Sequence, residues 1–235
     1  MKQRVRFAKH GKVRFLSHRD VARVWERALR RSGVRASYSE GFSPRPKLSF
    51  GLALSTGYES LGEYLDIDLA EEVDPAELPG IVTPSLPLGL EAQAAIPIAP
   101  GTDSLQQAVT SSSWRLEVVG VESSAIASAV ARVLALGELP IVVERKGAES
   151  DLDARPAILD LSADGAVLEA ELATQPRSLR PAELLRAMDP TWTLGRVLRT
   201  HQWTSVDGAR CEPIPLGDLG ACGATSAPHA QARAS

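Results

Sequence analysis

The sequence contains little cysteine and few aromatic residues. Only Cys211 and Cys222 occur among the 235 residues, and Phe, Trp and Tyr together make up 5% of the chain. No CxxC or HExxH motif and no His/Cys cluster is present, which argues against a structural zinc site or an iron–sulfur cluster held by this chain alone. The two cysteines could form a disulfide, although free thiols are the usual state in a cytoplasmic protein. We therefore expect no metal site and no cofactor in this chain.

Long apolar runs and nucleotide-binding fingerprints are also absent. No run reaches the roughly 18 apolar residues that a transmembrane helix needs, and the segment after Met1 has no apolar core of a signal peptide. No GxGxxG or Walker motif occurs. Apolar residues nevertheless make up 44% of the chain, which is enough for a core. We therefore expect a folded, cytoplasmic protein without a membrane partner.

The charges are distributed unevenly along the chain. The formal net charge is only −3. Residues 1–50, however, hold 14 Lys and Arg against three acids, a net charge of +11, and the rest of the chain carries −14. Such a basic block creates a positive potential that favours phosphate-bearing partners such as nucleic acid. The alternative is that the basic and acidic segments pack together and partly neutralise each other.

Hydrophobic periodicity divides the first 98 residues into short strands and helices. Lys2–Ala8 alternates apolar and polar residues, which predicts a half-buried strand. Ser17 and Asp20 form a variant of the capping box, and apolar residues recur at helical spacing until Gly33 ends the helix. Further strands are expected at 34–39, 48–54, 64–69 and 88–98, with a second helix starting at Asp74. The second and third of these strands compete for one place in the order β-α-β-β-α-β, the ferredoxin-like motif.

The same order of elements repeats later in the chain. Residues 99–113 are rich in small, polar and turn-forming types and predict a linker, after which strand and helix patterns return. We therefore predict an α+β protein of two tandem ferredoxin-like halves, a basic half over 1–98 and an acidic half over 114–205. The small, polar residues from 206 to 235 predict a disordered C-terminal tail.

Five arginines follow one side of the helix predicted after Ser17. At about 100° per residue they lie within about 120°, opposite the apolar stripe. They are Arg19, Arg23, Arg27, Arg30 and Arg31. The planar guanidinium group suits bidentate contacts with phosphate. We therefore predict that the last four bind RNA phosphates, and the alternative is an ordinary solvated helix face.

The proline-rich segment that follows cannot form regular structure. Its two prolines fix their own φ angles and favour extended geometry at the residues before them, while its glycine permits a tight turn. A stiff loop with cations beside an aromatic ring could neutralise and stack on single-stranded RNA. The loop contributes six residues to the predicted site: Gly41, Phe42, Pro44, Arg45, Pro46 and Lys47. The alternative is a rigid connection with Phe42 buried in the core.

His18 is the one candidate for acid–base chemistry. It lies at the start of the arginine helix, next to Ser17 and Asp20, where an imidazole can donate to a phosphate or act as an acid or base. A binding or positioning role and a purely structural role are the alternatives. Glu63, in a loop expected before the strand 64–69, completes the four residues that we expect to shape this site.

Several segments of the first 70 residues follow one another as in a known family. They are Phe15-Leu16-Ser17-His18-Arg19-Asp20, Arg27–Gly33, Tyr38–Phe50 and Gly62–Asp66. This combination closely resembles the radical SAM-linked proteins of the DUF2344 family, and the resemblance is weaker through the second half. In that family the domain occurs alone or fused behind a radical SAM domain. The resemblance implies a partner that carries an iron–sulfur cluster and S-adenosylmethionine, since this chain lacks the CxxxCxxC motif that holds such a cluster.

Two positions depart from the family pattern. Arg19 stands where an apolar residue is usual, and Arg45 stands where His is common. The second change weakens any catalytic role of the proline-rich loop and leaves a cationic contact intact. The architecture is also similar, more loosely, to the RNA-processing endoribonucleases of CRISPR systems, a likeness of fold that carries little functional weight.

Three hypotheses about function follow. The first is an accessory protein that binds RNA, or another phosphate-bearing substrate, and works with a radical SAM enzyme. The second is a metal-independent ribonuclease that uses His18 as acid or base. The third is a docking module for the radical SAM partner that has no affinity for RNA. We prefer the first, because the sequence holds no catalytic motif of its own.

Overall fold

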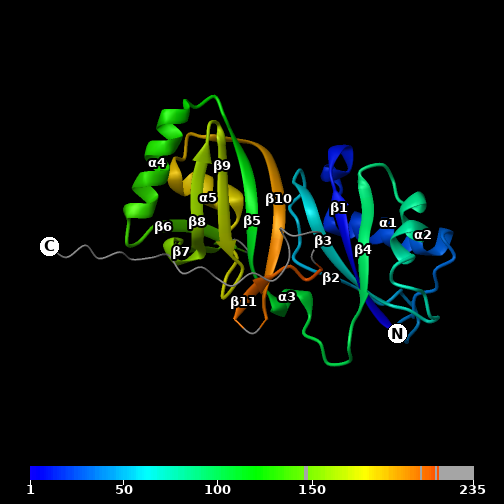
Figure 1. Ribbon diagram of the computed structural model, residues 1–235. Helices are drawn as coiled ribbons and strands as arrows, with labels where there is room; N and C mark the ends of the chain where they lie inside the picture. Colours follow the sequence, from blue (N-terminus) through cyan, green and yellow to red (C-terminus); the bar gives the residue numbers. More distant parts are fainter. Residues whose placement is uncertain (146–147, 207, 215, 217–235) are drawn as a thin grey trace.

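The computed structural model describes residues 1–145, 148–206, 208–214 and 216. They form a mixed α+β structure in which helices pack on one large sheet of strand order β4-β1-β3-β10-β5-β9-β8 (Figure 1). The strands are β1 Lys2–Lys9, β2 Leu48–Phe50, β3 Glu59–Asp68, β4 Leu90–Pro97, β5 Val109–Val119, β6 Pro140–Arg145, β7 Ala148–Asp153, β8 Ile158–Asp164, β9 Val167–Ala173, β10 Thr193–Val206 and β11 Ala209–Cys211. The α-helices are α1 His18–Arg31, α2 Leu78–Val82, α3 Leu105–Ala108, α4 Ser123–Ala135 and α5 Pro181–Met188, and the short 3-10 helices are Gly11–Phe15, Thr83–Ser85 and Arg155–Ala157.

The first part of the sheet consists of β4, β1, β3 and the short β2, and each neighbouring pair is antiparallel. Val5 and Phe7 of β1 lie in one core cluster with Leu65 and Ile67 of β3. Helix α1 packs its apolar stripe on this face, with Trp25 fully buried and its ring 5.1 Å from that of Phe7. The alternation in β1 therefore gives one apolar face, which this helix covers.

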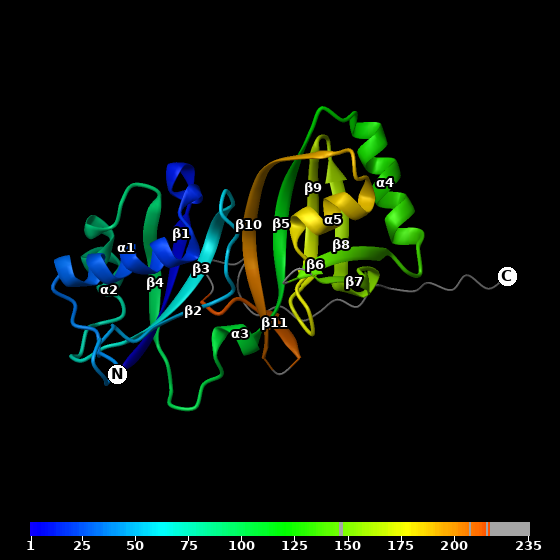
Figure 2. The ribbon, with the colours of Figure 1, turned by 180° about the vertical axis from the view of Figure 1, so that it is seen from behind.

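The second part of the sheet has the same arrangement of neighbours. Strands β10, β5, β9 and β8 are antiparallel in that order, and the core cluster on their apolar face includes Leu116, Ile126, Leu168 and Leu184. Ile126 comes from α4 and Leu184 from α5. Figure 2 shows α5 and α1 on the same side of the sheet. The hairpin of β6 and β7 forms a separate two-stranded sheet.

Strands β3 and β10 join the two parts into one sheet. They pair in parallel over a short register, with Leu198 opposite Glu59 and Arg199 opposite Ser60. Buried polar contacts reinforce this junction: Arg199 binds the carboxylate of Glu63, and the side-chain amide of Gln202 donates to the Gly62 carbonyl oxygen at 2.7 Å. The junction therefore depends more on charged and polar groups than on backbone pairing.

The strand expected at 34–39 does not form. The structure has only two isolated bridges there, Ala36 with Leu69 and Tyr38 with Pro46. Proline has no N–H to donate, so the partner segment cannot extend a ladder past Pro46. The chain is therefore extended here without being a strand.

Other boundaries also differ from the expected ones. The strand expected at 64–69 starts at Glu59, so Glu63 lies within β3 and not in a loop. The helix expected from Asp74 begins at Leu78, and β5 begins at Val109, inside the segment 99–113 expected to be a linker. Serine and threonine dominate 110–113, a composition typical of linkers, yet these residues pair with β9 and β10.

The segment after residue 205 is ordered where it is described. Strand β10 continues to Val206, β11 pairs with it, and Glu212 is buried against the first half. Arg6 Nη1 lies 2.6 Å from Glu212 Oε2, and the Tyr64 hydroxyl donates to Glu212 Oε1 at 3.3 Å. The expected disorder of 206–235 is therefore wrong for this part, because its carboxylate pairs with a buried guanidinium. The rest of the expected tail, 217–235, lies outside the described residues.

The structure also bears on two expectations from the sequence, the state of the cysteines and the absence of a membrane-spanning helix. Cys211 is buried in β11 and is not a free thiol, in contrast to the usual state of cysteine in the cytoplasm, and Cys222 lies outside the described residues. In the part of the chain that the structure describes, no helix is both long and apolar enough to cross a membrane.

Candidate functional site

Helix α1 has the two ends that the sequence predicts. The N-cap is Ser17, whose Oγ accepts the Asp20 N–H at 3.2 Å and donates to Asp20 Oδ2 at 2.7 Å. These bonds satisfy an N–H group that a helix start would otherwise leave free. Gly33, with a φ of 77°, follows the last turn, where a left-handed residue ends many helices. Asp20 and Ser17 therefore fix the start of the helix.

The predicted arginine stripe is exposed along the outer side of α1. It consists of Arg19, Arg23, Arg27, Arg30 and Arg31. Arg23 Nη1 lies 3.3 Å from Asp20 Oδ1, a surface ion pair of the kind that contributes little to stability. Among the described residues, the last three arginines form no ion pair. Their charges are therefore not neutralised by the acidic second half.

Two surface grooves flank α1, and arginines line both. Arg27 and Arg31 line the first groove together with the segment Pro84–Pro87 that leads to β4. Arg30 lines the second groove together with Tyr38 and Pro46. The arginines of α1 therefore reach a groove on each side of the helix, and the second groove extends to the base of the proline-rich loop.

The proline-rich loop is exposed to solvent. Phe42 is fully exposed, so the alternative in which it is buried in the core is wrong. Arg45 and Lys47 are exposed as well, and no regular element covers Gly41 or Pro44. The loop therefore presents an aromatic ring and two cations to solvent, as the sequence predicts.

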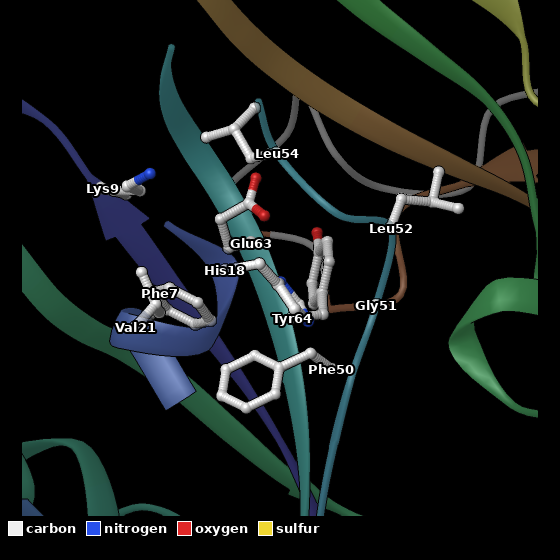
Figure 3. Close-up of a pocket in the computed structure, with 10 residues that line it drawn as sticks. All are labelled: Phe7, Lys9, His18, Val21, Phe50, Gly51, Leu52, Leu54, Glu63 and Tyr64. Carbon is white, nitrogen blue, oxygen red and sulfur yellow. The ribbon is translucent and has the colours of Figure 1, made fainter. Parts of the chain in front are cut away.

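His18 lines a small pocket at the other end of α1 (Figure 3). Its ring packs edge-on against Phe50 of β2, with 5.3 Å between ring centroids. Lys9 at the end of β1 and Glu63 of β3 line the same pocket. The structure thus brings two predicted residues, His18 and Glu63, to one place and adds a lysine that the sequence analysis did not select.

Lys9 is buried with only 1% of its surface exposed. Its Nζ donates to the carbonyl oxygens of Leu16 at 3.0 Å and Arg14 at 3.3 Å, which holds the turn that precedes α1. Burial lowers the pKa of the Lys9 ammonium; the carboxylate of Glu63 opposes this shift and the charge of Arg199 adds to it. Lys9 therefore loses its proton at a lower pH than an exposed lysine.

Glu63 is bound to Arg199 of β10. Both Glu63 oxygens accept from Arg199 Nη2 at 2.6 Å, and Oε1 also accepts from Nε at 3.0 Å. Arg199 Nη2 donates further to the Leu52 carbonyl oxygen at 2.9 Å. Both side chains are buried, so each charge would destabilise the fold without the opposite charge of its partner. Glu63 therefore shapes the pocket and holds the two halves together at the same time.

The predicted residues form two groups and not one. Helix α1 has 14 residues, so its ends lie about 20 Å apart. Ser17, His18, Asp20 and Glu63 lie at its start, whereas Arg30, Arg31 and the proline-rich loop lie at its end. A single small ligand cannot contact both groups, but a polymer that follows the helix can.

Sequence analysis missed Lys9 and Arg199, although a signal for both exists. In β1, Lys9 continues the alternation of Val5 and Phe7, and in β10, Arg199 continues from Val197, so both charges stand on apolar faces. A charge on the apolar face of a strand indicates a buried and paired group. In the described part of the chain, no group of His, Cys, Asp and Glu side chains could hold a metal ion.

Comparison with known proteins identifies the family of the chain. Residues 2–181 match the family model described as "Uncharacterized protein conserved in bacteria (DUF2344)". The matched residues are more than half of the chain and include α1, the proline-rich loop and the pocket around His18. No curated protein matches the chain.

Proposed function

The chain belongs to the DUF2344 family, and from this premise we propose that it is an RNA-binding accessory protein that works with a radical SAM enzyme. The observation that carries the proposal is the set of unpaired arginines on α1. Arg27, Arg30 and Arg31 are exposed in two neighbouring grooves, and none of them forms an ion pair within the described part of the chain, although Glu26 lines the groove of Arg30. Guanidinium groups in this arrangement suit the phosphates of a polynucleotide.

The proline-rich loop extends this surface toward bases. Phe42 exposes its ring completely, and Arg45 and Lys47, which follow it in the same loop, are exposed as well. An exposed ring in a loop that also exposes cations supports stacking of an unpaired base, which favours a single-stranded region of the RNA over a regular duplex. We therefore assign backbone contacts to α1 and base contacts to the loop.

We further infer that the two halves are a tandem pair of ferredoxin-like units. Support comes from the strand orders β4-β1-β3-β2 and β10-β5-β9-β8, each of which has the order 4-1-3-2 when its strands are counted along the chain without the β6–β7 hairpin. The partner enzyme, its iron–sulfur cluster and its S-adenosylmethionine are inferred from the family resemblance alone. The role of this chain would be to hold the RNA for that enzyme.

The test is RNA binding over a series of salt concentrations. Each phosphate contact adds about −0.7 to −0.9 to the slope of log affinity against log salt concentration. We expect a slope of several units for the unmodified protein and a flatter slope for Arg27→Glu/Arg31→Glu. The matched control is Arg115→Glu/Arg186→Glu, which changes the net charge equally in the second half.

Two results would contradict this proposal. Equal binding by the unmodified protein and by Arg27→Glu/Arg31→Glu would remove α1 from the RNA surface. No RNA binding at low salt, together with tight binding to the radical SAM protein, would favour the third hypothesis, a docking module.

A second candidate function is a metal-independent ribonuclease, favoured by the pocket that His18 shares with Lys9. The buried Lys9 has a lowered pKa and lines the same pocket as the His18 imidazole, so this pocket contains two groups that can move protons. Cleavage of RNA in EDTA that is lost in His18→Ala would support this function. Intact RNA after incubation with the unmodified protein would contradict it.

A further inference from the structure

A second pocket lies where the two halves of the molecule meet, and α1 contributes nothing to it. One part of its lining is the loop 52–58 between β2 and β3, and another is the segment Ser178–Pro181 at the start of α5. Ser112 and Trp114 of β5 and Arg199 of β10 complete the lining. We call this the junction pocket. It is separate from the arginines of α1, on which the proposed function depends.

Arg199 lines this pocket, and part of its guanidinium group has no hydrogen-bond partner among the described residues. Its Nε and Nη2 donate to Glu63 and to the Leu52 carbonyl oxygen. Its Nη1 forms no hydrogen bond with any described residue, although the side chain is only 2% exposed, and Nη1 is not fully sealed from solvent. A nearly buried guanidinium nitrogen needs an acceptor, which an anion in the pocket would supply.

A second cation and several hydroxyl groups surround the same space. Arg180 lines the pocket from the start of α5, and Ser55, Thr56, Tyr58 and Ser178 line it with hydroxyl groups. Burial raises the pKa of the Tyr58 hydroxyl, which Arg180 partly offsets, so this group stays protonated and can donate. Glu183 faces the same segment, where its Oε2 accepts the Arg180 backbone N–H and its Oε1 lies 3.6 Å from Arg177. The pocket is therefore lined by two arginines and several hydroxyl groups that can donate hydrogen bonds.

An aromatic side chain forms part of the lining beside the two arginines. The Tyr58 ring packs edge-on against Trp114, and Arg199 Cζ lies 5.2 Å from the centre of the indole on Trp114. Trp114 is thereby covered, whereas Tyr58 is only half-buried and leaves part of its ring accessible. Planar apolar groups pack well against such a ring.

We infer that the junction pocket binds a mononucleotide, with the phosphate between Arg180 and Arg199 and the base against Tyr58. Two guanidinium groups and the hydroxyl groups of the lining can donate to the three acceptor oxygens of a phosphate monoester. The ring of Tyr58 provides the surface for the base. This inference is independent of RNA binding by α1.

Calorimetric titration of the full chain with AMP, adenosine and inorganic phosphate tests the inference. We expect AMP to bind, phosphate to bind more weakly and adenosine to bind least. Arg180→Ala, at an exposed position, should weaken AMP binding about tenfold, the effect of one charge-assisted contact. The matched control is Arg186→Ala on the exposed side of the same helix, which should bind AMP as the unmodified protein does. Tyr58→Ser should weaken AMP binding more than phosphate binding, because it removes the ring against which the base packs.

Four outcomes would overturn the inference. They are no heat of binding with AMP at millimolar concentration, unchanged AMP affinity in Arg180→Ala, equal affinity for phosphate and AMP, and loss of AMP binding in Arg27→Glu/Arg31→Glu. The last outcome would place AMP on α1. If that variant loses RNA binding and still binds AMP, RNA binding by α1 and AMP binding by the junction pocket are two separate properties.

Discussion

At the scale of single residues, a few buried charges hold the site in place. Glu63, Arg199 and Lys9 lie close together where the halves meet, and each binds an opposite charge or a backbone carbonyl through at least one of its polar atoms. Removing one member of such a group leaves an uncompensated charge in a place that water barely reaches. The stability of the protein is therefore most sensitive at these positions.

Glu63→Ala should lower the free energy of unfolding by about 3–5 kcal/mol, because Arg199 stays buried without its carboxylate partner. Urea denaturation measures this change, with the exposed Glu72→Ala as control. The double variant Glu63→Leu/Arg199→Met should recover much of the loss, since it removes both charges. A loss below about 1 kcal/mol in the single variant, the value of a surface pair, would show that the pair is not effectively buried.

Glu59 should make the stability of the protein depend on pH in the acidic range. Burial by itself would raise the pKa of Glu59, but hydrogen bonds from Arg196 and from the Gly11 N–H, with the charges of Arg196 and Arg14, hold the pKa below its ordinary value of 4.5. A lowered pKa in the folded state stabilises the protein above that pH, and the contribution is lost as the pH falls through the folded value. Glu59→Gln should therefore show a smaller loss of stability below about pH 4.5 than the unmodified protein. Glu72→Gln should behave as the unmodified protein, and identical acid curves for all three would contradict the assignment.

At the scale of elements, the long regular segments were predictable and the short ones were not. Strand β1 and helix α1 carry clear periodicities, and the cap at Ser17 and the stop at Gly33 were found from the sequence. The linker over 99–113 was misplaced because serine-rich strand residues have the composition of a loop, and only pairing with β9 and β10 identifies them. Only part of the site could be predicted from the sequence. The exposed arginines follow from the periodicity of one helix. The contact of Arg199 with Glu63, in contrast, joins residues 136 positions apart, and no local pattern indicates it.

The cap of α1 gives a prediction at this scale. Ser17→Ala removes the oxygen that accepts the Asp20 N–H, and it should lower the free energy of unfolding by about 1 kcal/mol. Ser17→Thr keeps the oxygen and should stay close to the unmodified protein. Thermal and urea denaturation of the two variants measure the difference, and equal stability of both would show that the cap is not needed.

At the scale of the whole molecule, the junction predicts that both halves unfold together. Glu63 with Arg199, Glu59 with Arg196, and Arg6 with Glu212 tie the halves with buried carboxylates. Hydrogen exchange in increasing urea, followed by mass spectrometry, should give the same midpoint for peptides from β1 and from β9. Glu63→Ala should lower both midpoints equally. Two separate midpoints in the unmodified protein would show that the halves are independent folding units.

The pairing of β3 with β10 has a consequence for how this chain avoids self-association. Two separate sheets would leave four outer strands, each with unpaired backbone groups that can recruit another chain. In the continuous sheet β4 and β8 are the outermost strands, and part of β3 and part of β10 cover each other beside the short strands β2 and β11. A fragment that ends between the halves would uncover β3 or β10, and we expect it to aggregate where the full chain does not. The junction therefore joins the two halves and also protects the chain against fibre formation.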